Sequence, residues 1–90
     1  MGITVGDYKV EYYDENQEKK GEVTFPLIDQ NTVDINHTFV DASLRGMGMA
    51  GKLMEAAAQE IRRKGKKAVL TCSYAVKWFD SHKEYQDILK

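Results

Sequence analysis

The sequence predicts a single mixed α/β domain in which an antiparallel β-meander is followed by a β-α-β crossover and short C-terminal helices. The length of 90 residues suits one domain. The first 40 residues carry loosely alternating apolar positions, which is typical of strands, and the pattern then changes to helical spacing. A composition of 42% apolar and 30% charged residues is that of a globular protein and excludes disorder.

Three strands are expected in the N-terminal half, and short polar turns separate them. They span 8–13, 20–28 and 32–40. Pro26 has no N–H group to donate, so the second strand is expected at a sheet edge or with a bulge. Strands joined by such short turns pair antiparallel.

A long amphipathic helix is expected from Gly48 onward, and Gly65 is placed to end it. A compact β-type run follows at 67–72. A helix that connects two strands of one sheet requires parallel pairing and a right-handed crossover. The apolar positions that define the helix are Met49, Leu53, Ala57 and Ile61.

Two short helices are expected at the C-terminal end. Ser73 is a candidate cap for a helix over 74–80. The segment 81–84 reads Ser-His-Lys-Glu, which has the form of a capping box and predicts a final helix over 83–89.

Charge is divided unevenly along the chain. Residues 1–43 hold three lysines and nine acids, a balance of −6, whereas residues 44–90 hold ten Lys/Arg and five acids, a balance of +5. A basic C-terminal half suits a polyanionic ligand, although a solvated helix surface explains it as well. Nucleic acid is disfavoured as the ligand because no surface aromatics are interleaved with the basic run.

The chain carries no apolar run long enough for a membrane span, and its N-terminus lacks the pattern of a signal peptide. A single cysteine, Cys72, excludes an internal disulfide. These features lead us to expect a cytoplasmic protein.

Glycines between the third strand and the long helix suggest a phosphate-binding loop. The spacing Gly46-x-Gly48-x-x-Gly51 matches the dinucleotide fingerprint, but no Asp or Glu lies between residues 60 and 80 to bind a ribose. A P-loop requires Ser or Thr at position 53, where the chain has Leu, and an acid in the next strand to hold magnesium. Both nucleotide interpretations are therefore excluded, and no metal site is expected.

The remaining pattern, Arg45-x-x-Gly48-x-Ala50, resembles the pyrophosphate loop of the GNAT superfamily of N-acetyltransferases. The segments around it resemble a minimal single-domain subfamily of GNAT proteins with a cysteine at the strand end. The resemblance implies that acetyl-CoA is bound. Its pyrophosphate would contact the backbones of Met47, Gly48, Met49, Ala50 and Gly51, and Arg45 and Gly46 would complete the turn.

The same resemblance places the pantetheine arm between two strand ends, at Phe39-Val40 and Thr71-Cys72. The basic segment 62–67 would either reach the 3′-phosphate of the adenosine or be a solvated helix end.

Two departures from the superfamily pattern affect the chemistry. Cys72 stands where an asparagine is common, and Phe79 stands where a tyrosine protonates the departing thiolate. Cys72 precedes a predicted helix, which would lower its pKa and let it accept the acetyl group, or it is a small buried hydrophobe. Tyr74 is a candidate donor of a proton to the departing thiolate. His37 alternates with apolar positions, and we interpret it as a core or structural histidine.

The acceptor is not readable from the sequence. The chain lacks the helical pair and the extra strands that wall the acceptor amine in longer superfamily members. The site would be open or completed by a protein partner, which suits a protein or peptide amine. The alternative is a non-catalytic coenzyme A-binding or sensing module.

Overall fold

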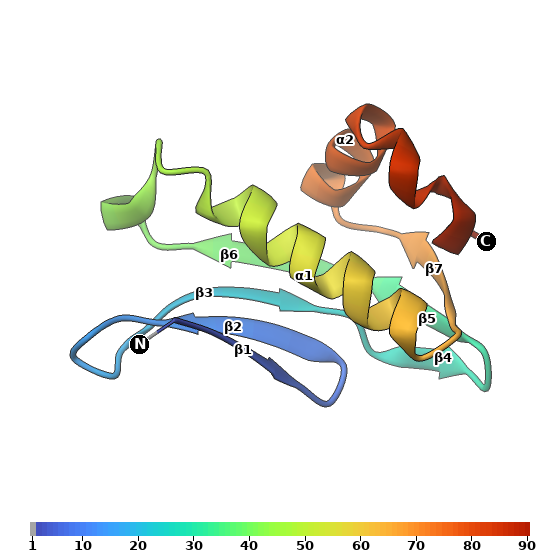
Figure 1. Ribbon diagram of the computed structural model, residues 1–90, viewed down its shortest axis with the longest axis horizontal. Helices are drawn as coiled ribbons and strands as arrows, with labels where there is room; N and C mark the ends of the chain where they lie inside the picture. Colours follow the sequence, from blue (N-terminus) through green and yellow to red (C-terminus); the bar gives the residue numbers. More distant parts are fainter. Residues whose placement is uncertain (1) are drawn as a thin grey trace.

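The computed structural model describes residues 2–90, which form two sheets and helices packed against them (Figure 1). The first sheet is antiparallel with the strand order β1-β2-β3-β6. Its strands are β1 (Gly2–Gly6), β2 (Lys9–Tyr13), β3 (Lys19–Thr24) and β6 (His37–Val40).

The second sheet contains the predicted crossover. It has the order β4-β5-β7, from β4 (Leu27–Asp29), β5 (Thr32–Ile35) and β7 (Lys67–Leu70). β4 pairs antiparallel with β5, whereas β5 and β7 run parallel. The mixed α/β fold, with a meander followed by a β-α-β unit, is therefore confirmed.

Two of the predicted strands are each divided between the two sheets, so the predicted bounds 20–28 and 32–40 were wrong. The first break lies at Phe25-Pro26, where Pro26 cannot donate to a ladder and Phe25 N donates to the Tyr8 carbonyl at 2.9 Å. The second lies at Asn36, whose N–H donates to the Thr24 carbonyl at 3.2 Å. Because the two breaks face each other, the chain changes sheets at one place.

The strand β1 was not predicted. It is short, glycines stand at both its ends, and its apolar residues Ile3 and Val5 are 40% and 51% exposed. A run this short gives little periodicity from which a strand can be recognised. It lies at the edge of the first sheet and pairs only with β2.

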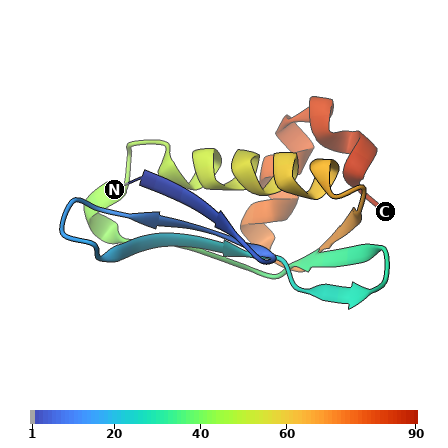
Figure 2. The same ribbon diagram turned by 60° about the horizontal axis from the view of Figure 1, so that its bottom comes forward.

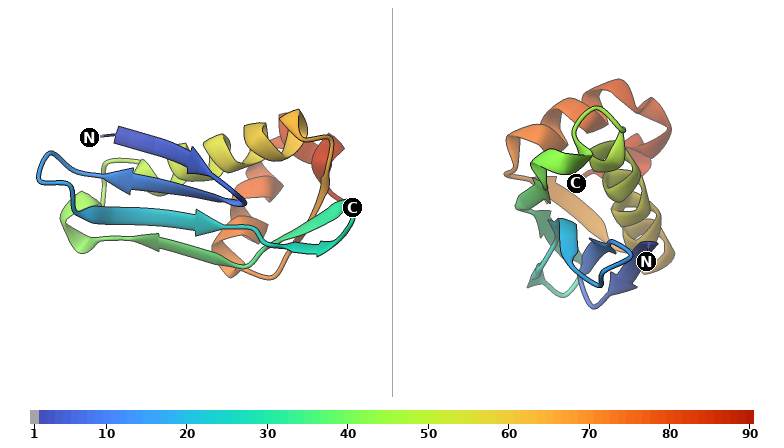
Figure 3. Two further views of the ribbon diagram at one scale, coloured as in Figure 1. Left: turned by 90° about the horizontal axis from the view of Figure 1, so that it is seen from below. Right: turned by 90° about the vertical axis from the view of Figure 1, so that its left-hand side faces the viewer.

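The long helix is confirmed as α1 (Met49–Arg63), and it lies across one face of the four-stranded sheet (Figure 2). Seen from below, the strands stand in front of this helix (Figure 3, left). Gly65 follows the helix with φ of 70°, as expected for a residue that ends one. The apolar stripe of α1 is buried at Met49, Leu53, Met54, Ala57, Ala58 and Ile61.

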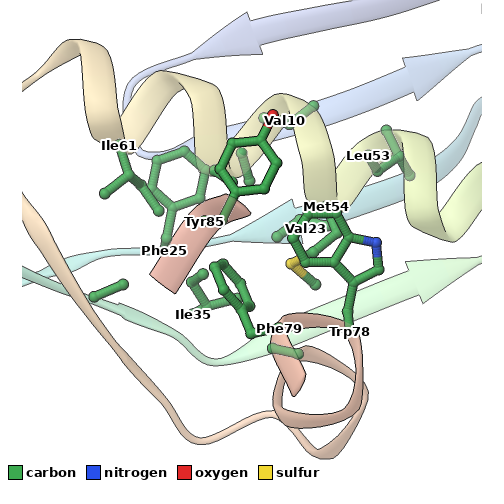
Figure 4. Packing of buried hydrophobic residues seen from close by; sticks show 14 of the residues in the cluster. Val10, Val23, Phe25, Ile35, Leu53, Met54, Ile61, Trp78, Phe79 and Tyr85 are labelled. Atoms are coloured by element: carbon green, nitrogen blue, oxygen red, sulfur yellow. The ribbon is translucent and has the colours of Figure 1, made fainter. Parts of the chain in front are cut away.

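Side chains from the sheets, α1 and the C-terminal segment form one core (Figure 4). Phe25, Ile35 and Phe79 meet beneath α1, and each is at most 1% exposed. Trp78 packs edge-on against Phe79 with ring centroids 5.0 Å apart. Trp78 and Phe79 are therefore core residues.

The C-terminal segment forms α2 (Ser73–Ser81) and a 3-10 helix, η2 (Lys83–Ile88). The predicted capping box was wrong, because His82 precedes η2 without a side-chain cap and Ser81 Oγ donates back to the Trp78 carbonyl. Ser73 was also misassigned, because it is the first residue of α2 and Cys72 occupies the cap position. None of the helices in residues 2–90 is long and apolar enough to cross a membrane.

Candidate functional site

The segment after β6 enters the glycine loop through a short 3-10 turn, η1 (Ala42–Leu44). Asp41 caps this turn, accepting from Ser43 N at 3.0 Å and from Ser43 Oγ at 2.6 Å. These hydrogen bonds from Ser43 hold the pKa of Asp41 below its ordinary value. The Arg45 amide then donates to Ala42, so hydrogen bonds fix the approach to the loop.

Two loop glycines adopt a backbone conformation that other residues rarely tolerate. Gly46 has φ of 83° and Gly48 has φ of 72°, and nothing lies within 4 Å of the position where a Cβ would stand at either residue. Both glycines therefore leave open space beside the backbone. Gly48 is also the cap of α1, with no side-chain cap hydrogen bond and no acidic residue in the first turn.

Several amides around this helix start have no backbone acceptor among residues 2–90. The first helical bond runs from Lys52 N to the Gly48 carbonyl, which leaves the amides of Gly48, Met49, Ala50 and Gly51 without one. The Met47 amide differs, because it donates to the Leu44 carbonyl at 3.3 Å.

A cavity of about 330 Å³ adjoins these amides, lined by Val40, Leu44, Arg45, Gly46, Gly48, Met49 and Ala50. Exposed donors and the positive end of a helix beside such a space suit an anion.

The basic segment 62–67 lies at the opposite end of α1. At a helical rise of about 1.5 Å per residue, this segment is roughly 20 Å from the loop. Arg62 pairs with Asp87, and Arg63 pairs with Glu60 at 2.7 Å. Of the two explanations for this segment, the structure supports the solvated helix end and not contact with an adenosine 3′-phosphate.

β6 and β7 diverge beyond the point where the chain changes sheets (Figure 1). The last backbone connection before this point is made by the carbonyl of Ile35, at the end of β5, which accepts from Thr71 N at 3.2 Å and from Cys72 N at 3.1 Å. Within residues 2–90, β6 pairs only with β3. The hydrogen bond from Asp41 N to the Lys20 carbonyl shows which residues of β6 direct their backbone groups toward β3 and which direct them away from it. By alternation, the amides and carbonyls of Thr38 and Val40 point to the open edge.

Cys72 lies at this opening, between the end of β7 and the start of α2. Its Sγ is 3.4 Å from Thr38 Oγ1, which links the two diverging strands. Burial acts to raise the pKa of the Cys72 thiol, but the Thr38 hydroxyl and the nearby amides of Ala75 and Tyr74 stabilise the thiolate and outweigh the effect of burial. The pKa therefore lies below its ordinary value, so the thiolate forms more readily than in an unperturbed cysteine.

Tyr74 is half-buried on the first turn of α2, and burial raises the pKa of its phenol. It therefore stays protonated at neutral pH and is able to donate a proton. Its hydroxyl lies 3.8 Å, and Trp78 Nε1 3.6 Å, from the position of a Cβ on Gly51. The first turns of α1 and α2 thus meet at Gly51, and the Tyr74 hydroxyl reaches the glycine loop.

Of the two interpretations of His37, core or structural, the core interpretation was wrong. The side chain is 56% exposed, and Nε2 lies 3.9 Å from Glu22 Oε1. Position 36 interrupts the strand, so the alternation that buries Val33 and Ile35 does not continue to His37. Phe39 shares the exposed side with His37 and is 38% exposed. Thr38 is the site residue that sequence reasoning missed, since one hydroxyl in a strand carries no signal by itself.

Among residues 2–90, no group of three or more His, Cys, Asp or Glu side chains is placed to hold a metal ion.

Comparison with known proteins assigns the class of this fold and site. The model of the GCN5-related N-acetyltransferase family matches residues 9–88, so the chain belongs to this family. The family uses acetyl-CoA as its acetyl donor. Among proteins with curated functions, none matches the sequence closely enough to count as a relative.

Solved structures agree with this assignment. The solution structure of a GCN5-like protein from Staphylococcus aureus is 31% identical, with a TM-score of 0.77 over 98% of this chain and 86% of that chain.

Two longer proteins share the fold at lower identity. A GNAT family acetyltransferase from Elizabethkingia anophelis, with acetyl-CoA bound, is 19% identical, with a TM-score of 0.62 over 86% of this chain and 51% of that one. The ribosomal-protein-S18-alanine N-acetyltransferase from Escherichia coli is 13% identical, with a TM-score of 0.68 over 87% of this chain and 54% of that one. The chain therefore spans about half the length of these two proteins.

Proposed function

We propose that this protein binds acetyl-CoA through the loop from Arg45 to Gly51 and transfers the acetyl group to an amine. The observation that carries the proposal is the row of amides without backbone acceptors, beside a cavity and two glycines of positive φ. This arrangement suits the pyrophosphate of coenzyme A. Family membership and the acetyl-CoA bound by the relative from E. anophelis support the same ligand.

In this proposal the amides of Gly48, Met49, Ala50 and Gly51 bind the pyrophosphate, and Gly46 shapes the turn before them. The Met47 amide donates to the Leu44 carbonyl, so in this proposal Met47 helps to position the loop backbone and does not bind the pyrophosphate through its amide. The exposed Arg45 guanidinium, which forms no ion pair within residues 2–90, adds positive charge. The 61% exposed Met47 side chain would cover an apolar part of the ligand.

The pantetheine arm would enter the opening between β6 and β7, flanked by Phe39-Val40 on one side and Cys72 on the other. Two features of the opening support this placement. The backbone groups of Thr38 and Val40 point to the open edge, where an amide-containing arm finds both donors and acceptors. Val40 also lines the loop cavity, so the opening is continuous with the proposed pyrophosphate site.

Transfer would follow one of two routes. In direct attack, the amine nitrogen bonds to the thioester carbonyl carbon, coenzyme A leaves as thiolate, and the amine loses a proton. In the covalent route, the Cys72 thiolate bonds to the thioester carbonyl carbon and coenzyme A leaves as thiolate. The amine then attacks the acetyl-cysteine, the Cys72 thiolate leaves, and the amine loses a proton. The lowered pKa of Cys72 supports the covalent route, and the protonated Tyr74 phenol is the candidate donor to the leaving thiolate.

The acceptor class that suits this chain is an amine on a protein or peptide. Support comes from size, because the chain spans about half the length of these two longer proteins. A large acceptor, or a protein partner, would contribute further contacts beside the opening.

Binding is tested by thermal unfolding with coenzyme A, acetyl-CoA, ATP and NAD. A ligand at 100 times its dissociation constant stabilises the folded state by about 2.7 kcal/mol. We expect this shift with coenzyme A and acetyl-CoA only. A shift with ATP or NAD and none with coenzyme A would overturn the proposed ligand.

Catalysis is tested by mass spectrometry after mixing with acetyl-CoA. We expect acetyl on Cys72 in the wild-type protein, none in Cys72→Ser, and release of the label when a reactive amine is added. Turnover with amines without any acetyl on Cys72 would exclude the covalent route and support direct attack by the amine. Neither label nor turnover with a broad amine panel would show a coenzyme A-binding or sensing module instead.

A further inference from the structure

The outer edge of the four-stranded sheet is unprotected. β1 pairs with β2 on one side, and its other side has no partner strand within residues 2–90. Its five residues, Gly-Ile-Thr-Val-Gly, include no proline and no charged side chain. Edge strands of single-chain proteins normally carry such residues because they prevent pairing with another chain. This edge is therefore open to a further strand.

An apolar row runs from the core to this edge. Val5 lies opposite Val10, which is fully buried, and Ile3 lies opposite Tyr12. Opposite residues of an antiparallel pair point to the same face, so Ile3 and Val5 lie on the face that α1 covers. Nevertheless they remain 40% and 51% exposed, because β1 extends beyond the helix.

We infer that a second copy of this chain pairs with β1 in antiparallel register, with the two-fold axis at Thr4. The strand is self-complementary in this register: Thr4 faces Thr4, Gly2 faces Gly6, and Ile3 faces Val5 of the second copy. Each Ile3–Val5 contact prolongs the apolar row, which then runs from the core of one copy to the core of the other. The two sheets become one continuous sheet.

Charges do not oppose this pairing. The nearest acid on the uncovered face is Glu11, which lies opposite Thr4 on β2. In the paired sheet the two Glu11 side chains would be three strand spacings apart, about 14 Å at 4.8 Å each. This distance exceeds the screening length of about 8 Å at physiological ionic strength. The Glu11 carboxylate is also close to Lys9 and Lys19 of its own chain, at 3.7 and 3.4 Å.

The dimer is weak and independent of the proposed acetyl-CoA site. One pair of five-residue strands buries much less than the roughly 1,600 Å² of a standard interface, so monomer and dimer exchange readily. β2 and β3 separate β1 from β6, which leaves the opening between β6 and β7 accessible in both copies. A failure of the proposed association would therefore not affect the proposal of acetyl transfer, and the reverse also holds.

Sedimentation velocity over a concentration series to about 1 mM tests this interface. We expect the weight-average mass of the wild-type protein to rise from 10.3 kDa toward twice that value. Thr4→Lys places two like charges at the two-fold axis and keeps the protein monomeric. Within its own chain the new lysine faces Glu11, so the fold is retained.

Charge reversal completes the design. Thr4→Glu alone also stays monomeric, whereas an equimolar mixture of Thr4→Lys and Thr4→Glu regains the association. Asn16→Lys, in the exposed turn between β2 and β3, carries the same added charge and dimerises as the wild type does. A constant mass of 10.3 kDa for the wild type, or undiminished association of Thr4→Lys, overturns the proposal.

Discussion

The two helices that meet at Gly51 begin in different ways, although neither has the Ser, Thr, Asp or Asn side chain that usually caps a helix. α1 begins at Gly48, in the left-handed conformation with φ of 72°, and α2 begins at Cys72, in an extended conformation with φ of −86°. Neither residue makes a side-chain capping hydrogen bond. Both helix starts therefore keep amides available for another negative group.

The difference lies in where the negative group comes from. At α1 the protein supplies only backbone, so the proposed anion is a ligand, and the open space beside Gly46 and Gly48 suits one. At α2 the protein supplies the group itself, since the amides of Tyr74 and Ala75 favour the thiolate of Cys72. In the proposed function, the same helix-terminal electrostatics serves binding at one helix and activation of a nucleophile at the other.

The largest effect is expected from Gly48→Ala. A residue with a Cβ at φ of 72° is strained by about 1–2 kcal/mol, and relief of the strain moves the first amides of α1. Hydrogen bonds to a charged group contribute about 1.5–3 kcal/mol each, so losing one lowers the affinity for coenzyme A about 10- to 100-fold. Titration calorimetry measures this change.

Gly65→Ala is the matched control for Gly48→Ala. Gly65 has φ of 70° at the other end of the same helix, and nothing lies within 4 Å of its Cβ position. The strain is therefore similar and the unfolding midpoint falls to a similar extent, but coenzyme A affinity stays unchanged. Equal losses of affinity in the two variants would show that strain in α1, and not displacement of the loop amides, explains the lower affinity of Gly48→Ala.

A smaller effect is expected from Thr38→Val, which removes the hydroxyl beside Cys72 and keeps the side-chain shape. The pKa of Cys72 rises toward its ordinary value because the thiolate loses a donor. A smaller fraction of the thiol is then ionised at neutral pH, so alkylation by iodoacetamide slows. Thr71→Val, whose hydroxyl bonds Asp34, is the control and leaves the thiol titration unchanged.

The same lowered pKa makes a prediction for stability. A thiol whose pKa is lower in the folded than in the unfolded state stabilises the fold fully above the unfolded pKa of about 8.5. This contribution is lost as the pH falls through the lower, folded pKa. The stability advantage of the wild type over Thr38→Val therefore grows from neutral pH to pH 9, measured by urea denaturation. A constant difference over that range would contradict a depressed Cys72 pKa.

The sequence predicted the α1 side of this comparison better than the α2 side. α1 has a long apolar period and glycines at both ends, so its bounds and its loop followed from local pattern. The parallel pairing of β5 and β7 followed from the connection itself. By contrast, the predictions of a Ser73 cap and of a capping box at 81–84 were wrong, because helix caps depend on backbone geometry that residue type does not determine.

The opening between β6 and β7 could be expected only through family resemblance. It results from the two breaks at Phe25-Pro26 and Asn36, of which only Pro26 leaves a trace in the sequence. The contact between Thr38 and Cys72 joins residues 34 positions apart, and no local pattern encodes it. His37 became exposed for the same reason, because the break at Asn36 interrupts the alternation that predicted its burial.

The smallest effect is expected from Gly51→Ala, which distinguishes the third loop glycine from the other two. Gly51 lies inside α1, and a Cβ would stand 3.6 Å from Trp78 Nε1 and 3.8 Å from the Tyr74 hydroxyl, both ordinary contact distances. Alanine favours a helix over glycine by up to about 1 kcal/mol, so the free energy of unfolding rises slightly. The amide is retained, and coenzyme A affinity changes less than twofold. If affinity falls about tenfold while stability rises, the ligand must pass between α1 and α2 at Gly51, and the two helix starts would then form a single site.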